Sequence, residues 1–310
     1  MGYRPMDSRI QLKIKDAGHY ANYSYSTGSR PLSGSGPWVQ SFGSSSSYFA
    51  GKSWYGGASN SLATNPGLSS YQIFSAGGKS YLSIELEMEA GDAALAWAQH
   101  VIDTHKGLPT IVTTHEYITP PARNDTSLPG VVPATRAADG YLAGSPGGWN
   151  SAQAVWDKFI KTNDQIFMVL NGHAWNPTVN GVSTSENIRI DNNDAGHPVY
   201  QILTDYQGNT IGPNGVIGSD PGGDGWLRLM EFDTTTNTIH FVTYSPTLNK
   251  YAGLNGESTF GQPAAFSDFT LAIPTQVLTA EVPEPASFGL MLTGLALMGA
   301  AARRRKAGAN

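Results

Sequence analysis

The chain has 310 residues, enough for one large domain or two small ones. Its net charge is −5, its charged share is 14% against a usual share of roughly 25%, and its body carries no basic stripe, which argues against nucleic-acid binding. The absence of cysteine excludes disulfides and thiolate zinc sites, and leaves His, Asp, Asn and Glu as the available metal ligands.

The N-terminal segment, residues 1–49, is rich in Ser, Tyr and Gly and shows no regular period. Its first twenty residues contain neither an apolar core of about 7–15 residues nor the small-residue cleavage site of a signal peptide. We interpret residues 20–70 as ordered loop with short strands, because Trp38, Phe49 and Trp54 are aromatics of a kind that disordered segments lack.

Regular patterns begin at Ser70. The stretches SYQIFSAGG and KSYLSIELEME predict two strands joined at Gly77 and Gly78, the second alternating polar with apolar residues. Asp92 is the predicted cap of a helix over residues 93–105, which has one apolar face. A short strand over residues 109–114 follows.

The middle of the chain alternates between strands and helices. A Pro- and Gly-rich loop over residues 119–149 is long enough to be an active-site or binding loop. A helix is predicted over 151–161, and an apolar strand over 165–170 leads into the heptapeptide LNGHAWN. Further strands are predicted over 198–205, 226–232 and 238–244. This order, with its strand-rich end, predicts an α/β fold with a mixed sheet.

Two histidines follow directly after predicted strands, His115 and His173. In α/β folds, ligands gather beyond the carboxyl ends of the strands, and a neutral imidazole binds transition metals. A divalent metal requires about four to six ligands, so on spacing alone two unrelated strand-end histidines are the simpler interpretation.

Three further polar groups are weaker candidates. Asp191–His197 either coordinates a cation through its oxygens or forms a polar turn before the strand at 198, and the turn is the simpler interpretation. Asp205 and its neighbours Tyr206 and Gln207 lie at a strand end, where they would line the same cleft as the histidines. Glu116 is either a neighbour of a metal ligand or an exposed residue.

Residues 50–250 resemble the second half of calcineurin-like metallophosphoesterases. The resemblance is carried, in order, by DAALAWAQHVIDTHKGLPTIVTTHEY, WDKFIKTNDQIFMVLNGH, GHPVYQILTDYQ and GDGWLRLMEFD. It implies a mixed β-sheet sandwich flanked by helices, incomplete at its N-terminus, with residues 50–275 as the domain. It also implies two metals that activate water and polarise a phosphate ester.

Carried over to this chain, the resemblance assigns two metal ligands and no catalytic residue. His115 matches the family's isolated histidine, and Gly172–His173 matches the start of its GHxH motif, which implies one manganese, iron or zinc ion held by both histidines. Trp175 stands where a ligand of the other metal is expected, and an indole has no lone pair to donate. The motifs GDxH, GDxx and GNH[DE] have no counterpart, and Asp16–Tyr20 is either a remnant of the last or an ordinary loop.

The C-terminus has a Pro-Glu-Pro triplet at 283–285, uncharged residues over 286–302, and a basic cluster at 303–306. As a helix, the uncharged stretch would span about 26 Å, near the short limit for a bilayer core. Residues 282–306 resemble the PEP-CTERM sorting signal of Gram-negative bacteria. The resemblance implies export, transient anchoring in the inner membrane through 286–302, processing by an exosortase, and delivery to the cell surface or extracellular matrix. A buried helix with a solvated basic tail is the alternative.

An export signal at one end and no signal peptide at the other lead to the hypothesis that N-terminal sequence, including half of the metal motifs, is missing. The sequence therefore leaves two functions open. One is an exported metallophosphoesterase-like protein with weak or no hydrolysis of phosphate esters. The other is a non-catalytic binding protein of the cell surface or matrix, anchored through its C-terminal segment. A third possibility is the product of a truncated gene that has no stable function.

Overall fold

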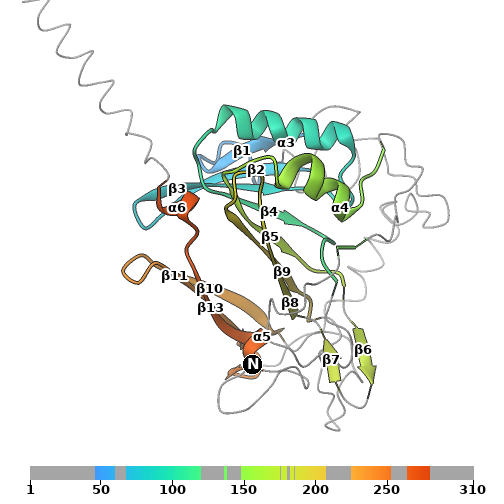
Figure 1. Ribbon diagram of the computed structural model, residues 1–310, viewed down its shortest axis with the longest axis vertical. Helices are drawn as coiled ribbons and strands as arrows, with labels where there is room; N and C mark the ends of the chain where they lie inside the picture. The colour runs from blue at the N-terminus through green and yellow to red at the C-terminus, as the bar shows by residue number, and fades with distance from the viewer. Residues whose placement is uncertain are drawn as a thin grey trace, which may run out of the picture.

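The computed structural model describes residues 46–59, 68–119, 136–137, 148–174, 176–179, 182–184, 186–206, 225–252 and 264–279. These residues form three layers, with helices over one face of a large sheet and a smaller sheet against its other face (Figure 1). The sequence-based expectation of an α/β fold with a mixed sheet is confirmed, and the structure adds that the sheet is large and the helices among the described residues are few.

The large sheet has seven strands with a parallel centre and antiparallel flanks. Its order is β1 (Tyr55–Ala58), β2 (Ser70–Ala76), β3 (Lys79–Glu85), β4 (Thr110–Thr114), β5 (Ile166–Asn171), β9 (Pro198–Thr204) and β8 (Glu186–Asn192). The neighbours β3, β4, β5 and β9 run parallel, while β1–β2–β3 and β8–β9 are antiparallel. The parallel strands carry apolar residues towards both faces, as expected for a sheet covered on both sides.

The smaller sheet is antiparallel and centres on β11. It contains β10 (Leu227–Asp233), β11 (Thr238–Ser245), β12 (Lys250–Tyr251) and β13 (Asp268–Ala272), and β11 pairs with each of the others. A separate hairpin joins β6 (Asn176–Val179) to β7 (Val182–Thr184). Two short helices, α5 (Ala264–Ser267) and α6 (Thr275–Leu278), flank β13.

The helical layer corrects the predicted role of Asp92. Helix α3 (Asp92–Thr104) has Gly91 as its N-cap, without a side-chain cap. Asp92 is instead the first helical residue, and its carboxylate accepts hydrogen bonds from Lys158 Nζ at 2.7 Å and Asn150 Nδ2 at 2.9 Å. The second predicted helix is present as α4 (Ala152–Val155), which continues directly into a π-helical turn, η2 (Trp156–Ile160).

Two apolar cores hold the layers together. The first lies between the large sheet and the helices, and joins sheet residues such as Ile84 and Val169 to Ala98 of α3 and Phe159 of η2. The second lies between the two sheets and contains buried residues of each, among them Phe167, Tyr200, Ile239 and Phe241, together with Val277 of α6.

A buried polar network also links the two sheets. Glu186, at the start of β8, is 1% exposed and forms an ion pair of 2.5 Å with Arg228 of β10. The same carboxylate accepts hydrogen bonds from Tyr206, from Thr243 at 2.8 Å and from Ser267 at 2.6 Å. Burial, followed by the charge of Glu186, raises the pKa of Tyr206 far above its ordinary value, so this hydroxyl stays a donor.

Several predicted features lie outside the described residues: the N-terminal segment up to residue 45, most of the loop over 119–149, Trp175 and the C-terminal segment 282–306. Within the part of the chain that the structure describes, no helix has both the length and the hydropathy needed to cross a bilayer.

The Glu186 network gives a stability prediction. Replacing Glu186 with Gln leaves Arg228 buried without a counter-charge, and the loss of one partner from a buried ion pair costs about 3–5 kcal/mol. We therefore expect Glu186→Gln to lower the free energy of unfolding by about that amount in urea denaturation. Glu231→Gln, at an exposed position of β10, is the matched control and should change it by less than about 0.5 kcal/mol. Equal effects from the two substitutions would contradict a structural role for the network.

Candidate functional site

Three neighbouring parallel strands end at the same edge of the large sheet, each followed by a residue that could take part in binding. β4 pairs with β5, and β5 pairs with β9, all in the same direction. His115 follows the last residue of β4, His173 comes two residues after β5, and Asp205 follows the last residue of β9. We call this the histidine edge.

The structure brings together the two histidines that the sequence singles out. Their ring centroids lie 4.5 Å apart, with the ring planes inclined by 49°. The backbones are tied as well, because Gly172 N donates a hydrogen bond to the carbonyl oxygen of His115 over 3.1 Å. His115 is exposed and His173 is half-buried, so the pair lies at the surface of the edge.

The backbone at His173 has a conformation that is uncommon for a residue with a side chain. Its φ is +65°, in the left-handed region, and Ala174 N closes a tight turn onto the carbonyl of Gly172 over 2.8 Å. A Cβ at Gly172 would lie 3.3 Å from the carbonyl oxygen of Thr204, so glycine allows the close approach of this turn to the end of β9. Unusual backbone of this kind concentrates at functional sites.

The electrostatics of the edge favour a neutral His115. Although part of the residue is exposed, desolvation of the His115 ring by the surrounding protein lowers its pKa, and the nearby His173 lowers it further. The carboxylate of Asp205 opposes both effects by raising the pKa. The net pKa lies below the ordinary histidine value of 6.5. At neutral pH the imidazole therefore keeps a lone pair that can accept a proton or bind a metal.

The complete ligand set of a metal centre is not found among the residues described. In those ranges, no group of three or more His, Cys, Asp or Glu side chains has the arrangement to hold a metal ion. His115 and His173 are a pair, and the carboxylate of Asp205, which follows β9, acts electrostatically on His115. Of the other residues weighed from the sequence, Asp16, His19 and Trp175 lie outside the described ranges.

The polar segment Asp191–His197 forms the turn between β8 and β9. Asn193 Oδ1 accepts from the backbone N–H groups of Ala195 and His197, over 3.0 and 2.9 Å, which closes the turn. The Asp191 carboxylate accepts from Arg136, Arg189 and Gln201. These bonds support the turn interpretation, and the segment lies at the amino end of β9, opposite the histidine edge.

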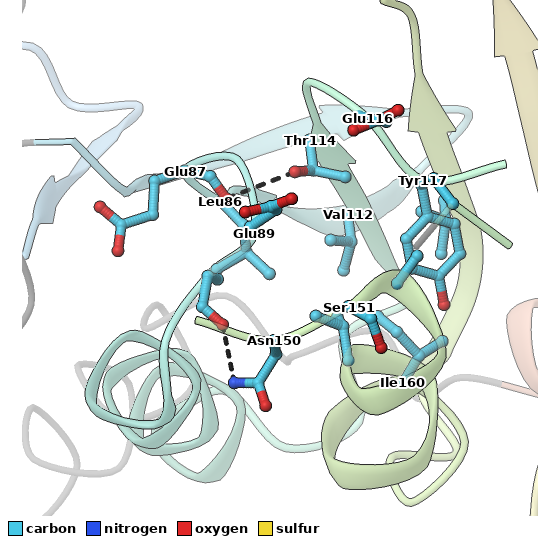
Figure 2. A pocket seen from close by; sticks show the side chains of 15 residues that line it. Leu86, Glu87, Glu89, Val112, Thr114, Glu116, Tyr117, Asn150, Ser151 and Ile160 are labelled. Carbon is cyan, nitrogen blue, oxygen red and sulfur yellow. Dashed lines mark hydrogen bonds between the residues drawn. The ribbon is translucent and has the colours of Figure 1, made fainter. Parts of the chain in front are cut away.

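A pocket beside the histidine edge contains acidic residues that the sequence analysis did not single out as a group. Glu87 and Glu89, after β3, and Glu116, after His115, are each less than 10% exposed and line it (Figure 2). Thr114 Oγ1 donates to the carbonyl of Glu87 over 3.4 Å, and Asn150 Nδ2 donates to the carbonyl of Ala90 over 2.9 Å. Glu116 is thus buried, which rules out its interpretation as an exposed residue. The sequence did contain a signal for this acidic pocket. The run E-L-E-M-E begins at the last residue of β3 and places Glu87 and Glu89 just beyond the carboxyl end of that parallel strand.

Comparison with known proteins identifies the C-terminal segment. Residues 281–306 match the family model of the PEP-CTERM protein-sorting motif, which confirms the prediction made from the Pro-Glu-Pro triplet and the residues after it. The motif indicates an exported, surface-directed protein that is sorted by an exosortase.

The chain has a distant relative that carries no functional description. Over 200 residues it is 26% identical to the "Uncharacterized protein YvnB" of Bacillus subtilis (strain 168). The match covers 64% of this chain and 12% of that protein, so the chain spans about an eighth of the length of the curated relative. No solved structure matches the chain.

The arrangement of charges at the histidine edge predicts opposite effects of two substitutions. His173→Asn removes a neighbour that lowers the pKa of His115, so this pKa should rise; asparagine also tolerates a positive φ. Asp205→Asn removes the group that raises the pKa, so it should fall. Titration of the His115 ring by NMR measures both shifts. His197→Asn, at the opposite edge of the sheet, should leave the value unchanged, and shifts of the same sign in the first two variants would contradict this account.

Proposed function

We propose that the chain is part of an exported metallophosphoesterase-like protein in which His115 and His173 bind one divalent transition metal, manganese, iron or zinc. One observation carries the proposal: two imidazoles follow adjacent parallel strands with their centroids 4.5 Å apart. Ligands of α/β folds gather at this edge of a sheet. The sequence resemblance to calcineurin-like metallophosphoesterases assigns the same two residues.

The residues present fit such an ion as part of its ligand set. Two histidine nitrogens that share one cation are each about 2.0–2.1 Å from it and so about 3 Å from one another. Rings whose centroids are 4.5 Å apart can direct two nitrogens at one point with that spacing. The lowered pKa of His115 supports the fit, because a metal binds the deprotonated ring.

In this proposal the chain's residues bind and orient, and the ion would supply Lewis acidity towards a phosphate oxygen. The backbone hydrogen bond from Gly172 to His115 fixes the distance between the two strand ends. The carboxylate of Asp205 adds negative charge, which favours a cation beside the histidines.

Catalysis by this chain is expected to be weak or absent. Two-metal hydrolysis requires a second ion that stabilises the attacking and leaving oxygens. The motifs that would hold it, GDxH, GDxx and GNH[DE], have no counterpart in the sequence, and Trp175 replaces another ligand. Phosphate-ester hydrolysis is therefore the proposed ancestral activity, and metal binding is the property that this chain retains.

The metal site is tested by titrating the full chain with zinc chloride in a calorimeter. We expect about one ion per chain. His115→Ala and His173→Asn should each weaken the affinity for zinc at least about tenfold, because the loss of a residue that only hydrogen-bonds to a metal ligand already lowers metal affinity about 10–100-fold. His197→Ala is the control. This histidine pairs with Asp164 at the opposite edge of the sheet, so its loss should leave the zinc affinity unchanged. Affinity should also fall as the pH drops below 6.5, where protons compete for the rings.

An aryl-phosphate assay with added manganese, iron or zinc separates the remaining outcomes. Robust turnover that His173→Asn abolishes would contradict the expectation of weak hydrolysis while supporting the site. If both histidine variants still bind zinc as tightly as the unchanged chain, the assignment of His115 and His173 as ligands is overturned. A chain that binds no metal would overturn the proposal, and would favour a non-catalytic binding role or a gene fragment.

A further inference from the structure

The last described helix, α6, is fixed to the amino ends of the parallel strands. Lys79 Nζ, at the start of β3, donates to the carbonyl oxygens of Val277 and Leu278, both over 2.8 Å. Gln276 Nε2 donates to the carbonyl of Pro198, the first residue of β9, over 3.0 Å. Figure 1 shows α6 beside β3 accordingly. We call this side of the large sheet the amino edge; it is opposite the histidine edge.

Apolar burial also holds α6 in place. Val277 is 1% exposed and belongs to the core between the two sheets. Immediately before the helix, Ile273 N donates to the carbonyl of Asn237 over 2.8 Å, and Tyr200 Oη donates to the carbonyl of Ala272 over 2.8 Å. Hydrogen bonds and core packing together make α6 an integral part of the fold, so Thr279, the last described residue, lies at the amino edge.

Six residues, 280–285, separate Thr279 from the uncharged segment of the sorting motif, and we call them the tether. Thr279 is the last described residue, and the uncharged segment of the motif begins at residue 286. The six residues between them reach at most about 20 Å when fully extended. The histidine edge lies farther from Thr279 than the amino edge does, because the six residues of β5 span about 20 Å between the two edges.

We propose that, while the chain is anchored through residues 286–302, the amino edge faces the lipid surface and the histidine edge faces away from it. The partner at the amino edge is the outer surface of the bilayer that holds the anchor. This inference rests on the anchoring step of the sorting route and is independent of whether the histidines bind a metal. It means that solutes outside the membrane reach His115 and His173 without passing between the protein and the bilayer.

The tether, and not charge, sets this orientation. The turns at the amino edge carry both signs, with the exposed Lys106 after α3 and the exposed Asp164 and Asp194 before β5 and β9. Such a mixed surface has little net attraction to anionic lipid, which requires clusters of Lys or Arg. We therefore expect the orientation to be lost when the tether is lengthened.

The absence of cysteine makes the test direct, because single cysteines can be introduced without competing thiols. Ala76→Cys places a donor dye at the exposed turn between β2 and β3, at the amino edge. Leu248→Cys places it in the exposed turn between β11 and β12. That turn lies on the side of the histidine edge, because Tyr206 after β9 contacts Thr243 near the end of β11.

The full chain is reconstituted in vesicles of phosphatidylethanolamine and phosphatidylglycerol that contain an acceptor-labelled lipid, and energy transfer gives the distance from each dye to the bilayer. We expect the dye at position 76 to lie about 20 Å closer than the dye at position 248. Inserting twenty Gly/Ser residues after Thr279 adds roughly 25 Å of flexible reach and should largely remove the difference.

Equal distances in the chain with its own tether, or a closer approach at position 248, would overturn the proposed orientation. Failure of the chain to remain with the vesicles during flotation would overturn the anchoring and with it the orientation. Neither result bears on zinc binding by His115 and His173, so the two proposals fail separately.

Discussion

The parallel pairing of β4, β5 and β9 is the constraint on which the candidate site depends. Parallel strands end at the same edge, so residues 115, 173 and 205, which are far apart in the sequence, become neighbours. The close approach at Gly172 and the positive φ of His173 then turn the chain back after β5 and bring the second imidazole towards the first. Apolar residues on both faces of these strands pack into the two cores, and this close packing holds the strands in place.

The two sheets act as one body because polar and apolar contacts cross between them. Glu186 joins residues of β8, β10, β11 and the end of α5 through bonds to Arg228, Thr243 and Ser267, and it also fixes Tyr206. Tyr206 is the residue after Asp205, so the network that links the sheets also holds the backbone beside the charge that raises the pKa of His115. At the opposite edge, α6 continues the same inter-sheet core up to Thr279, the last described residue. The fold thus places the candidate site and the last described residues before the sorting motif at opposite edges of the large sheet.

Much of this arrangement could be predicted from sequence, and its limits have physical causes. Strands β4, β5 and β9 were predicted within a residue or two, because apolar runs followed by polar residues mark the ends of buried strands. The two strand-end histidines were singled out for the same reason, and their role as metal ligands stays a prediction. The buried Glu186–Arg228 pair was not foreseen, because its partners are 42 residues apart and neither has a local signal. The pocket glutamates were also missed, since their burial depends on the packing of α3 and α4 against the sheet. Asp92 was assigned as a cap from its residue type, whereas its carboxylate is bonded to Lys158 and Asn150.

The central claim is that one cation is shared by His115 and His173 at the carboxyl ends of β4 and β5. Anomalous X-ray diffraction from crystals of the full chain grown with zinc tests it most directly, because the signal locates the ion itself. The account predicts an anomalous peak between the two imidazoles, about 2.0–2.1 Å from one nitrogen of each. Zinc located elsewhere in the chain, with no peak between these rings, would contradict it.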